Sequence, residues 1–387
     1  MRNFKEIQEI LGTPPDVKKI YLIGCTGAGK TSLVQHIIGS KKHGFPVTSQ
    51  RRTTIAPTEY VIQKNIPYKT TIILKNKNDV LFAIEELIQG AILKAKQDNS
   101  VIEDIIFELE QSPDDRFKLN QMVSSDTFSK IANDIITNVL PPIQAKDIND
   151  ETLLSNSFIK SEIDKIVAEI LAEIEENFKI ACKNTHTPFS NETLVIENID
   201  NKDEFILKTK KLLSHDFGSI SILAEYIRIE GDLLVDWLDP SLEFLLIDGE
   251  GIGHSLGEKR DTLSARHYNY FNYCNSIVLI DDANDPFAAG GHGAIEGIFL
   301  NGYQEKFKLV FSKTDKLEQT DQNAYFRRNL NNLRNALKQD DIDFKEENKD
   351  TFKLNALDDK TINEESKKSI QRLLTNINSS KEKIQSL

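Results

Sequence analysis

A glycine-rich turn followed by lysine and threonine is the feature that most restricts how this chain can fold. Residues 24–31, GCTGAGKT, fit the pattern G-x-x-x-x-G-K-[ST] and lie between the apolar run 20–23 and the apolar-periodic residues that start at Leu33. A strand, such a turn and a helix form a phosphate-binding loop, because consecutive backbone N–H groups and the helix N-terminus converge on phosphate oxygens. The residues predicted to hold phosphate are Gly24, Cys25, Thr26, Gly27, Ala28, Gly29, Lys30, Thr31 and Ser32.

Two residues of this loop have predicted chemical roles. The Lys30 ammonium is expected to reach the β- and γ-phosphates of a bound nucleotide, and the Thr31 hydroxyl is expected to bind Mg²⁺. Nucleotide binding is therefore the first functional expectation.

Three further apolar runs indicate the rest of the fold. Residues 244–247 end at Asp248, residues 277–280 end at an Asp-Asp pair, and residues 309–311 end at Ser312. Continuous apolar runs of this length are typical of strands buried on both faces of a parallel sheet. Open α/β sheets bind ligands at the carboxyl ends of their strands, so the fold class is α/β with its polar groups gathered at one edge.

The middle of the chain has a different periodicity. Apolar residues recur at three- and four-residue steps, with Glu and Lys between them, at Ile159, Ile163, Ile166, Ile170, Ile174 and Phe178. This spacing predicts an amphipathic helix. We expect a mostly helical insertion over residues 78–237 that divides the α/β domain into residues 1–77 and 238–387.

Composition excludes several classes of protein. The 387 residues carry 48 Lys+Arg against 60 Asp+Glu, a net charge of −12, which argues against a broad nucleic-acid-binding surface. Three widely spaced cysteines give no disulfide framework or zinc-ligand spacing. Neither a signal peptide nor a membrane-spanning run is recognised, so a cytoplasmic protein without a nucleic-acid partner is expected. Peripheral membrane contact stays open, although the polar helix faces carry Glu as readily as Lys.

The residues near the end of the chain favour guanine as the base. In Ser312-Lys313-Thr314-Asp315, the Asp315 carboxylate can accept hydrogen bonds from guanine N1–H and its exocyclic amino group, a donor pair that adenine lacks. The stem of Lys313 can lie along the ring face. A strand at 352–354 leads into Asn355, Ala356 and Leu357, where a backbone N–H near Ala356 could meet guanine O6.

In this order the motifs resemble those of the Ras-like, translation-factor-related (TRAFAC) superfamily of P-loop GTPases. The matching segments are GCTGAGKT at 24–31, RRTTIAPTEY at 51–60, DGEG at 248–251, SKTD at 312–315 and NAL at 355–357. The resemblance covers the segments that flank the insertion and not the insertion itself. It implies a three-layer domain with a mainly parallel six-stranded sheet that binds GTP or GDP with Mg²⁺.

The resemblance also implies roles for the two switch segments. Asp248 would hold Mg²⁺ through water, the Gly251 N–H would sense the γ-phosphate, and loss of that phosphate would release both switches. Thr54 is the preferred switch threonine, with Thr53 and Thr58 as alternatives. The metal ligands implied are Thr31, Thr54 and Asp248. The catalytic residues implied are Lys30, Thr54, Gly251 and Arg51, the last because its spacing to Thr54 resembles the transition-state arginine of heterotrimeric G-protein α subunits.

One position departs from the Ras pattern, and the sequence therefore does not identify the group that orients the attacking water. After Gly251, where Ras-like enzymes place the glutamine that orients water, this chain has Ile252. Hydrolysis is therefore expected to need another residue, a protein partner or a second copy of the chain. The main hypothesis is a GTPase whose switches control the helical insertion or self-assembly. One alternative is a GTP-dependent scaffold with negligible turnover, and another is a P-loop ATPase using Asp248 and Glu250, which Asp315 disfavours.

Overall fold

The described part of the chain contains a nine-stranded mixed sheet. The computed structural model describes residues 2–12, 16–47, 56–96, 101–110, 118–145, 156–183, 188–189, 191–249, 251–252, 263–288, 290–318, 321–339, 342–344 and 351–379. Within these ranges the strand order is β4-β3-β5-β2-β6-β1-β7-β8-β9. The strands are β1 (Lys18–Ile23), β2 (Thr58–Ile62), β3 (Tyr68–Leu74), β4 (Thr193–Ile199), β5 (Ala224–Gly231), β6 (Phe244–Asp248), β7 (Ser276–Asp282), β8 (Phe307–Ser312) and β9 (Thr351–Lys353).

The expectation of an α/β fold with a mainly parallel sheet is confirmed, but the expected number of six strands is wrong. Parallel pairs join β6, β1, β7, β8 and β9 in sequence, while β2 is antiparallel to β6 and parallel to β5. The additional strands include β4 and β5, which contain polar residues that interrupt the continuous apolar pattern from which strands were predicted. In β5, for example, the buried Arg228 pairs with the buried Glu59 of β2.

The apolar runs of the sequence form the buried strands that position the site. In β1, residues 20–23 are all at most 2% exposed. Because β6, β1, β7 and β8 are neighbours and run in the same direction, their carboxyl ends lie at one edge of the sheet. Gly24, Asp248, Asp281 and Ser312 are therefore brought to that edge, as open parallel sheets require for a ligand site.

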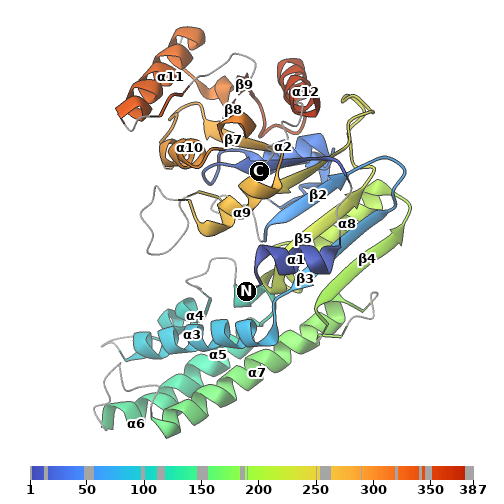
Figure 1. Ribbon diagram of the computed structural model, residues 1–387. Helices are drawn as coiled ribbons and strands as arrows, with labels where there is room; N and C mark the ends of the chain where they lie inside the picture. The colour runs from blue at the N-terminus through green and yellow to red at the C-terminus, as the bar shows by residue number, and fades with distance from the viewer. Residues whose placement is uncertain are drawn as a thin grey trace. The chain divides into compact units, whose positions relative to one another are not determined.

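The chain divides into two compact units, and the one that contains the phosphate loop comprises residues 2–71, 197–210 and 227–387. In Figure 1, α10, α11 and α12 (orange to red) lie around β7, β8 and β9. The helices that belong wholly or mainly to this unit are α1 (Phe4–Leu11), α2 (Lys30–Ile37), α8 (Lys202–Leu212), α9 (Ala265–Tyr273), α10 (Gly291–Leu300), α11 (Gln322–Gln339) and α12 (Glu364–Ser379).

The other unit comprises residues 72–196 and 211–226 and is mostly helical. Its helices run alongside one another in Figure 1: α3 (Lys77–Ala95), α4 (Ile102–Glu110), α5 (Ser125–Asp134), a π-helix (Ile135–Val139), α6 (Leu140–Ala145) and α7 (Ser157–Ala181). The apolar stripe predicted from Ile159 to Phe178 is the buried face of α7. The segment 78–237 also contains β4, α8 and β5, so it combines a helical unit with strands of the sheet.

Among the described residues, no helix is both long enough and apolar enough to cross a bilayer.

Candidate functional site

The phosphate loop predicted at residues 24–31 connects β1 to α2. Gly27 (φ +78°) and Gly29 (φ +101°) occupy the left-handed region, which favours glycine. A Cβ at Gly24 would lie 2.2 Å from the carbonyl oxygen of Ile280, so the loop can approach β7 only without a side chain there. Gly29 is the N-cap of α2 and offers no capping side chain, an arrangement in which the first N–H groups of a helix are suited to an anion.

Lys30 is buried over this loop. The residue is only 3% exposed. Its Nζ donates hydrogen bonds to the carbonyl oxygens of Gly24 (2.6 Å) and Cys25 (3.1 Å). Burial lowers the pKa of Lys30, whereas the Asp248 carboxylate nearby favours the charged form. The carbonyl groups of the loop thus satisfy the donors of a buried lysine side chain.

The Thr31 hydroxyl and Asp248 meet beside it. Thr31 Oγ1 donates to Asp248 Oδ2 at 2.7 Å, and Asp248 is 2% exposed. Burial raises the pKa of Asp248, and Lys30 and the Thr31 hydrogen bond oppose that rise. The second carboxylate oxygen, Oδ1, is buried and has no hydrogen-bond partner in the described part of the chain. A hydroxyl and an unsatisfied carboxylate oxygen are ligands suited to Mg²⁺ and its bound waters, so these residues fit the metal that the sequence predicts.

The residues after β6 continue along the phosphate loop. The Ile252 N–H donates to the Gly24 carbonyl oxygen at 3.1 Å, and Ile252 and Cys25 form a parallel bridge that extends the pairing of β1 with β6. The side chain of Ile252 is buried, at 4% exposure, so it offers no polar group to a water molecule. Gly251, the residue predicted to sense the γ-phosphate, directly precedes this bridge.

Gly249 has a structural requirement that the sequence does not reveal. A Cβ at this position would lie 2.4 Å from the Tyr21 ring. Tyr21 is held there because its hydroxyl forms a 2.7 Å hydrogen bond with His267 Nδ1 and its ring stacks on Tyr270 at 4.6 Å between centroids. The backbone that follows Asp248 is therefore packed directly against a buried aromatic cluster of β1 and α9.

Several predicted site residues lie outside the described ranges. Arg51, Thr53 and Thr54 of the first switch and Glu250 of the second are among them, so their predicted roles stay predictions. The competing threonine, Thr58, is described: it begins β2, is paired in register with Asp248, and its hydroxyl donates to the Ala56 carbonyl oxygen at 3.0 Å.

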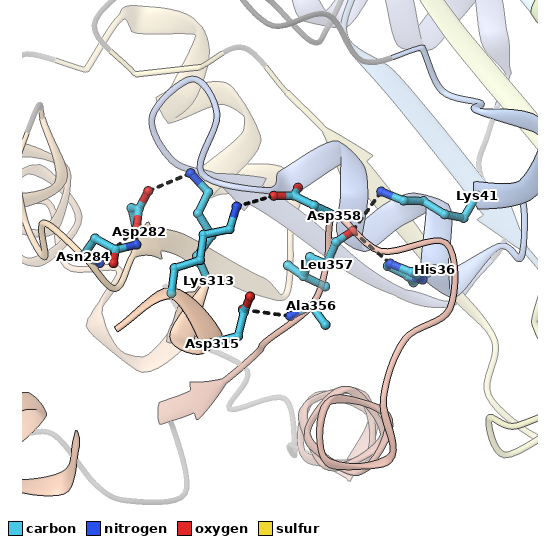
Figure 2. Close-up of polar contacts among 10 residues, drawn as sticks. His36, Lys41, Asp282, Asn284, Lys313, Asp315, Ala356, Leu357 and Asp358 are labelled. Carbon is cyan, nitrogen blue, oxygen red and sulfur yellow. Dashed lines mark hydrogen bonds and ion pairs between the residues drawn. The ribbon is translucent and has the colours of Figure 1, made fainter. Parts of the chain in front are cut away.

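The residues predicted to bind the base also come together, as Figure 2 shows. The Asp315 carboxylate accepts a 2.9 Å hydrogen bond from the Ala356 N–H, so the predicted acceptor for guanine N1–H and the predicted donor to O6 are adjacent. Lys313 forms a 2.7 Å ion pair with Asp282 at the end of β7. The sequence places Asp282 at a strand end but does not indicate this ion pair, because Asp282 ends β7 whereas Lys313 follows β8.

A second buried carboxyl lies next to the phosphate loop. Asp281, at 3% exposure, accepts a 2.6 Å hydrogen bond from the Phe287 N–H, and a Cβ at Gly291 would lie 3.1 Å from its Oδ1. The carboxyl therefore faces the N-terminus of α10. Burial is the main cause that raises the pKa of Asp281 to about 7.

Asp281 gives the folded protein a predicted pH dependence. Between the usual aspartate pKa and about 7, the folded state binds a proton that the unfolded state does not, so stability falls as pH rises through this window. Asp281→Asn keeps an acceptor for Phe287 and cannot ionise. Relative to wild type, the variant should gain about 3 kcal/mol of unfolding free energy between pH 5 and pH 8. Denaturant unfolding at both pH values measures this gain, and Asp164→Asn at an exposed position of α7 is the control. An equal difference at both pH values would contradict the prediction.

Comparison with known proteins gives little beyond these observations. No protein-family model matches the sequence, and no curated protein matches it. Among solved structures, the chain is similar to chains of an oligomerised bacterial dynamin pair described as a mechanism for the long-range sensing and tethering of membranes. One has 14% identity, a TM-score of 0.44, and coverage of 96% of this chain and 39% of its own. Another has 13% identity, a TM-score of 0.42, and coverage of 97% and 40%. The present chain thus spans about two fifths of those chains, and TM-scores below 0.5 establish no common family.

Proposed function

We propose that this protein binds GTP with Mg²⁺ and hydrolyses it to GDP and phosphate. The observation that carries the proposal is the arrangement at the end of β1, where a buried Lys30 lies above a glycine loop beside Thr31 and Asp248, whose Oδ1 accepts no hydrogen bond from the residues that the structure describes. Such a set of cation, hydroxyl and carboxylate around a helix N-terminus is suited to the β- and γ-phosphates and their metal.

Each described residue has a proposed task in the reaction. Lys30 would exchange its bonds to loop carbonyl groups for bonds to phosphate oxygens and stabilise the charge that develops during in-line attack by water. Thr31 and Asp248 would hold Mg²⁺, which neutralises charge on the phosphate oxygens. The Gly251 N–H would sense the γ-phosphate. Thr54 and Arg51 are proposed as the switch threonine and the transition-state arginine.

The buried Ile252 supports slow hydrolysis by the isolated chain. Its N–H is paired with Gly24 and its side chain is enclosed, so the position offers nothing to orient the attacking water. A second copy of the chain or a protein effector that contacts the helical insertion, residues 78–237, is proposed to supply the missing group. The same observation favours a second candidate, a GTP-dependent scaffold with negligible turnover. A cytoplasmic location is a further prediction from the sequence.

Two measurements test the proposal. Calorimetric titration with Mg²⁺ should show GTP and GDP binding at least 100-fold more tightly than ATP, because adenine cannot donate to Asp315. Phosphate release should then be measured over a range of protein concentrations. A rate per molecule that rises with concentration supports hydrolysis activated by self-association, and no release at any concentration supports the scaffold. Equal affinity for ATP, or no binding of GTP, would contradict the proposed nucleotide specificity.

A further inference from the structure

The loop after β9, residues 354–358, carries the N–H predicted to donate to guanine O6, and β8 and α12 fix its first half. The Leu354 carbonyl oxygen accepts from the N–H and from the hydroxyl of Thr314, both at 3.2 Å. The Asn355 N–H donates to Ser366 Oγ at 2.8 Å. These contacts hold the start of the loop next to the strand that ends in the SKTD motif.

The second half of the loop is held by the segment that follows the phosphate loop. The Leu357 carbonyl oxygen accepts from His36 Nε2 at 3.0 Å and from Lys41 Nζ at 2.8 Å (Figure 2). Because a carbonyl oxygen can only accept, the His36 ring carries its proton on Nε2. His36 belongs to the last turn of α2 and is 5% exposed, and Lys41 begins the short helix Lys41–His43. Burial lowers the pKa of both side chains.

Leu357 also contacts the phosphate loop with its side chain. A Cβ at Gly29 would lie 3.2 Å from Leu357 Cδ1, and Leu357 is 3% exposed. One residue therefore contacts the start of α2 through its side chain and the end of α2 through its carbonyl oxygen. The helix that follows the phosphate loop and the loop that is predicted to meet the base are joined at this point.

The residue between the two anchors has an unfavourable backbone conformation. Ala356 has a φ of +54°, a left-handed value that is unfavourable for a residue other than glycine. Such a conformation persists only where neighbouring contacts determine it. Without the contacts that hold Leu357, Ala356 could leave this conformation, and the segment that carries its N–H would lose its fixed place beside Asp315.

We infer that His36 and Lys41 are positioning residues for base recognition. They hold Leu357 on α2 and so keep the Ala356 N–H next to the Asp315 carboxylate, where it is expected to meet guanine O6 when the base binds, and they thereby link the phosphate helix to the selection of the base. This inference rests on the proposed GTP site. It assigns to two basic residues outside the recognised motifs a role in discriminating between purines.

The test compares three nucleotides on the double variant His36→Ala with Lys41→Ala. In 6-thio-GTP a sulfur, a weak acceptor, replaces O6, whereas inosine triphosphate lacks only the amino group assigned to Asp315. Wild type should prefer GTP to 6-thio-GTP about tenfold. The double variant should bind GTP about tenfold more weakly and prefer it to 6-thio-GTP only about twofold. Its preference for GTP over inosine triphosphate should be unchanged.

Matched variants separate positioning from general damage. Lys42→Ala changes the adjacent lysine, which pairs with Asp203 at 2.6 Å, and should leave all three affinities unchanged. The single variant His36→Gln keeps Lys41 and places an amide donor near the position of Nε2. It should therefore prefer GTP to 6-thio-GTP as wild type does, unlike the double variant. If the double variant does not fold, Lys41→Ala alone should show half of the effect on a logarithmic scale.

A folded double variant that still prefers GTP to 6-thio-GTP as wild type does would overturn the inference. Wild-type protein that binds no guanine nucleotide would instead overturn the proposed function, and the wild-type titration alone decides this.

Discussion

Lys30→Met should lower the affinity for GTP by at least about 100-fold, since hydrogen bonds to charged groups are worth about 1.5–3 kcal/mol each and Lys30 is expected to reach two phosphates. Methionine keeps most of the length and the apolar stem of the side chain but removes the ammonium. In the present structure that ammonium donates hydrogen bonds to the carbonyl oxygens of Gly24 and Cys25. Titration calorimetry with GTP and Mg²⁺ measures the loss.

Lys19→Met is the matched control for this change. Lys19 lies on the same strand, β1, near its amino end, and its Nζ is 5.3 Å from the centre of the Tyr273 ring. Because this is the opposite end of the strand from the phosphate loop, the control should bind GTP as wild type does. A folded Lys30→Met protein with an affinity within about threefold of wild type would show that the loop does not hold a triphosphate.

The phosphate loop and the strands beside it could be predicted because their determinants are local. A strand buried on both faces is a run of apolar residues, and the loop pattern lies within eight consecutive residues, 24–31. The same reasoning placed Asp248 and Asp315 at strand ends. The structure brings Asp248 to Thr31 and Asp315 to Ala356, contacts that the motif order suggested but that periodicity alone could not supply.

What the sequence could not provide are pairings between residues far apart in the chain. From sequence alone, an arginine such as Arg228 of β5 is expected at the surface. In the structure it is buried because it pairs with Glu59, 169 positions away. From sequence alone, His36 is a polar residue near the end of a helix. In the structure its ring forms a hydrogen bond with the Leu357 carbonyl oxygen, 321 positions away. Buried charges and ring nitrogens are tolerated where a partner satisfies them, and no local pattern reveals that partner.

Asp315→Asn should reverse the choice of base, from GTP to xanthosine triphosphate. The carboxylate offers two acceptors, which match guanine N1–H and the amino group at C2. An amide offers one acceptor and one donor, and xanthine has a carbonyl oxygen at C2 that takes the donor. Affinity for GTP should fall about 100-fold, because the asparagine amide donor would face the guanine amino donor, and affinity for xanthosine triphosphate should rise to exceed it. Competition binding with the two nucleotides measures the ratio.

The geometry of the ligand-free site makes this substitution informative. Asp315 accepts the Ala356 N–H through one oxygen at 2.9 Å, and an asparagine oxygen can accept the same bond, so the loop should keep its conformation. Asp358→Asn is the control, since Asp358 lies in the same loop region and pairs with Lys316 at 2.7 Å. That change removes the same charge near the site but should leave the preference for GTP intact. If both variants weakened GTP binding equally, without any gain for xanthosine triphosphate, the charge of this region and not hydrogen bonding by Asp315 would determine the binding of the base.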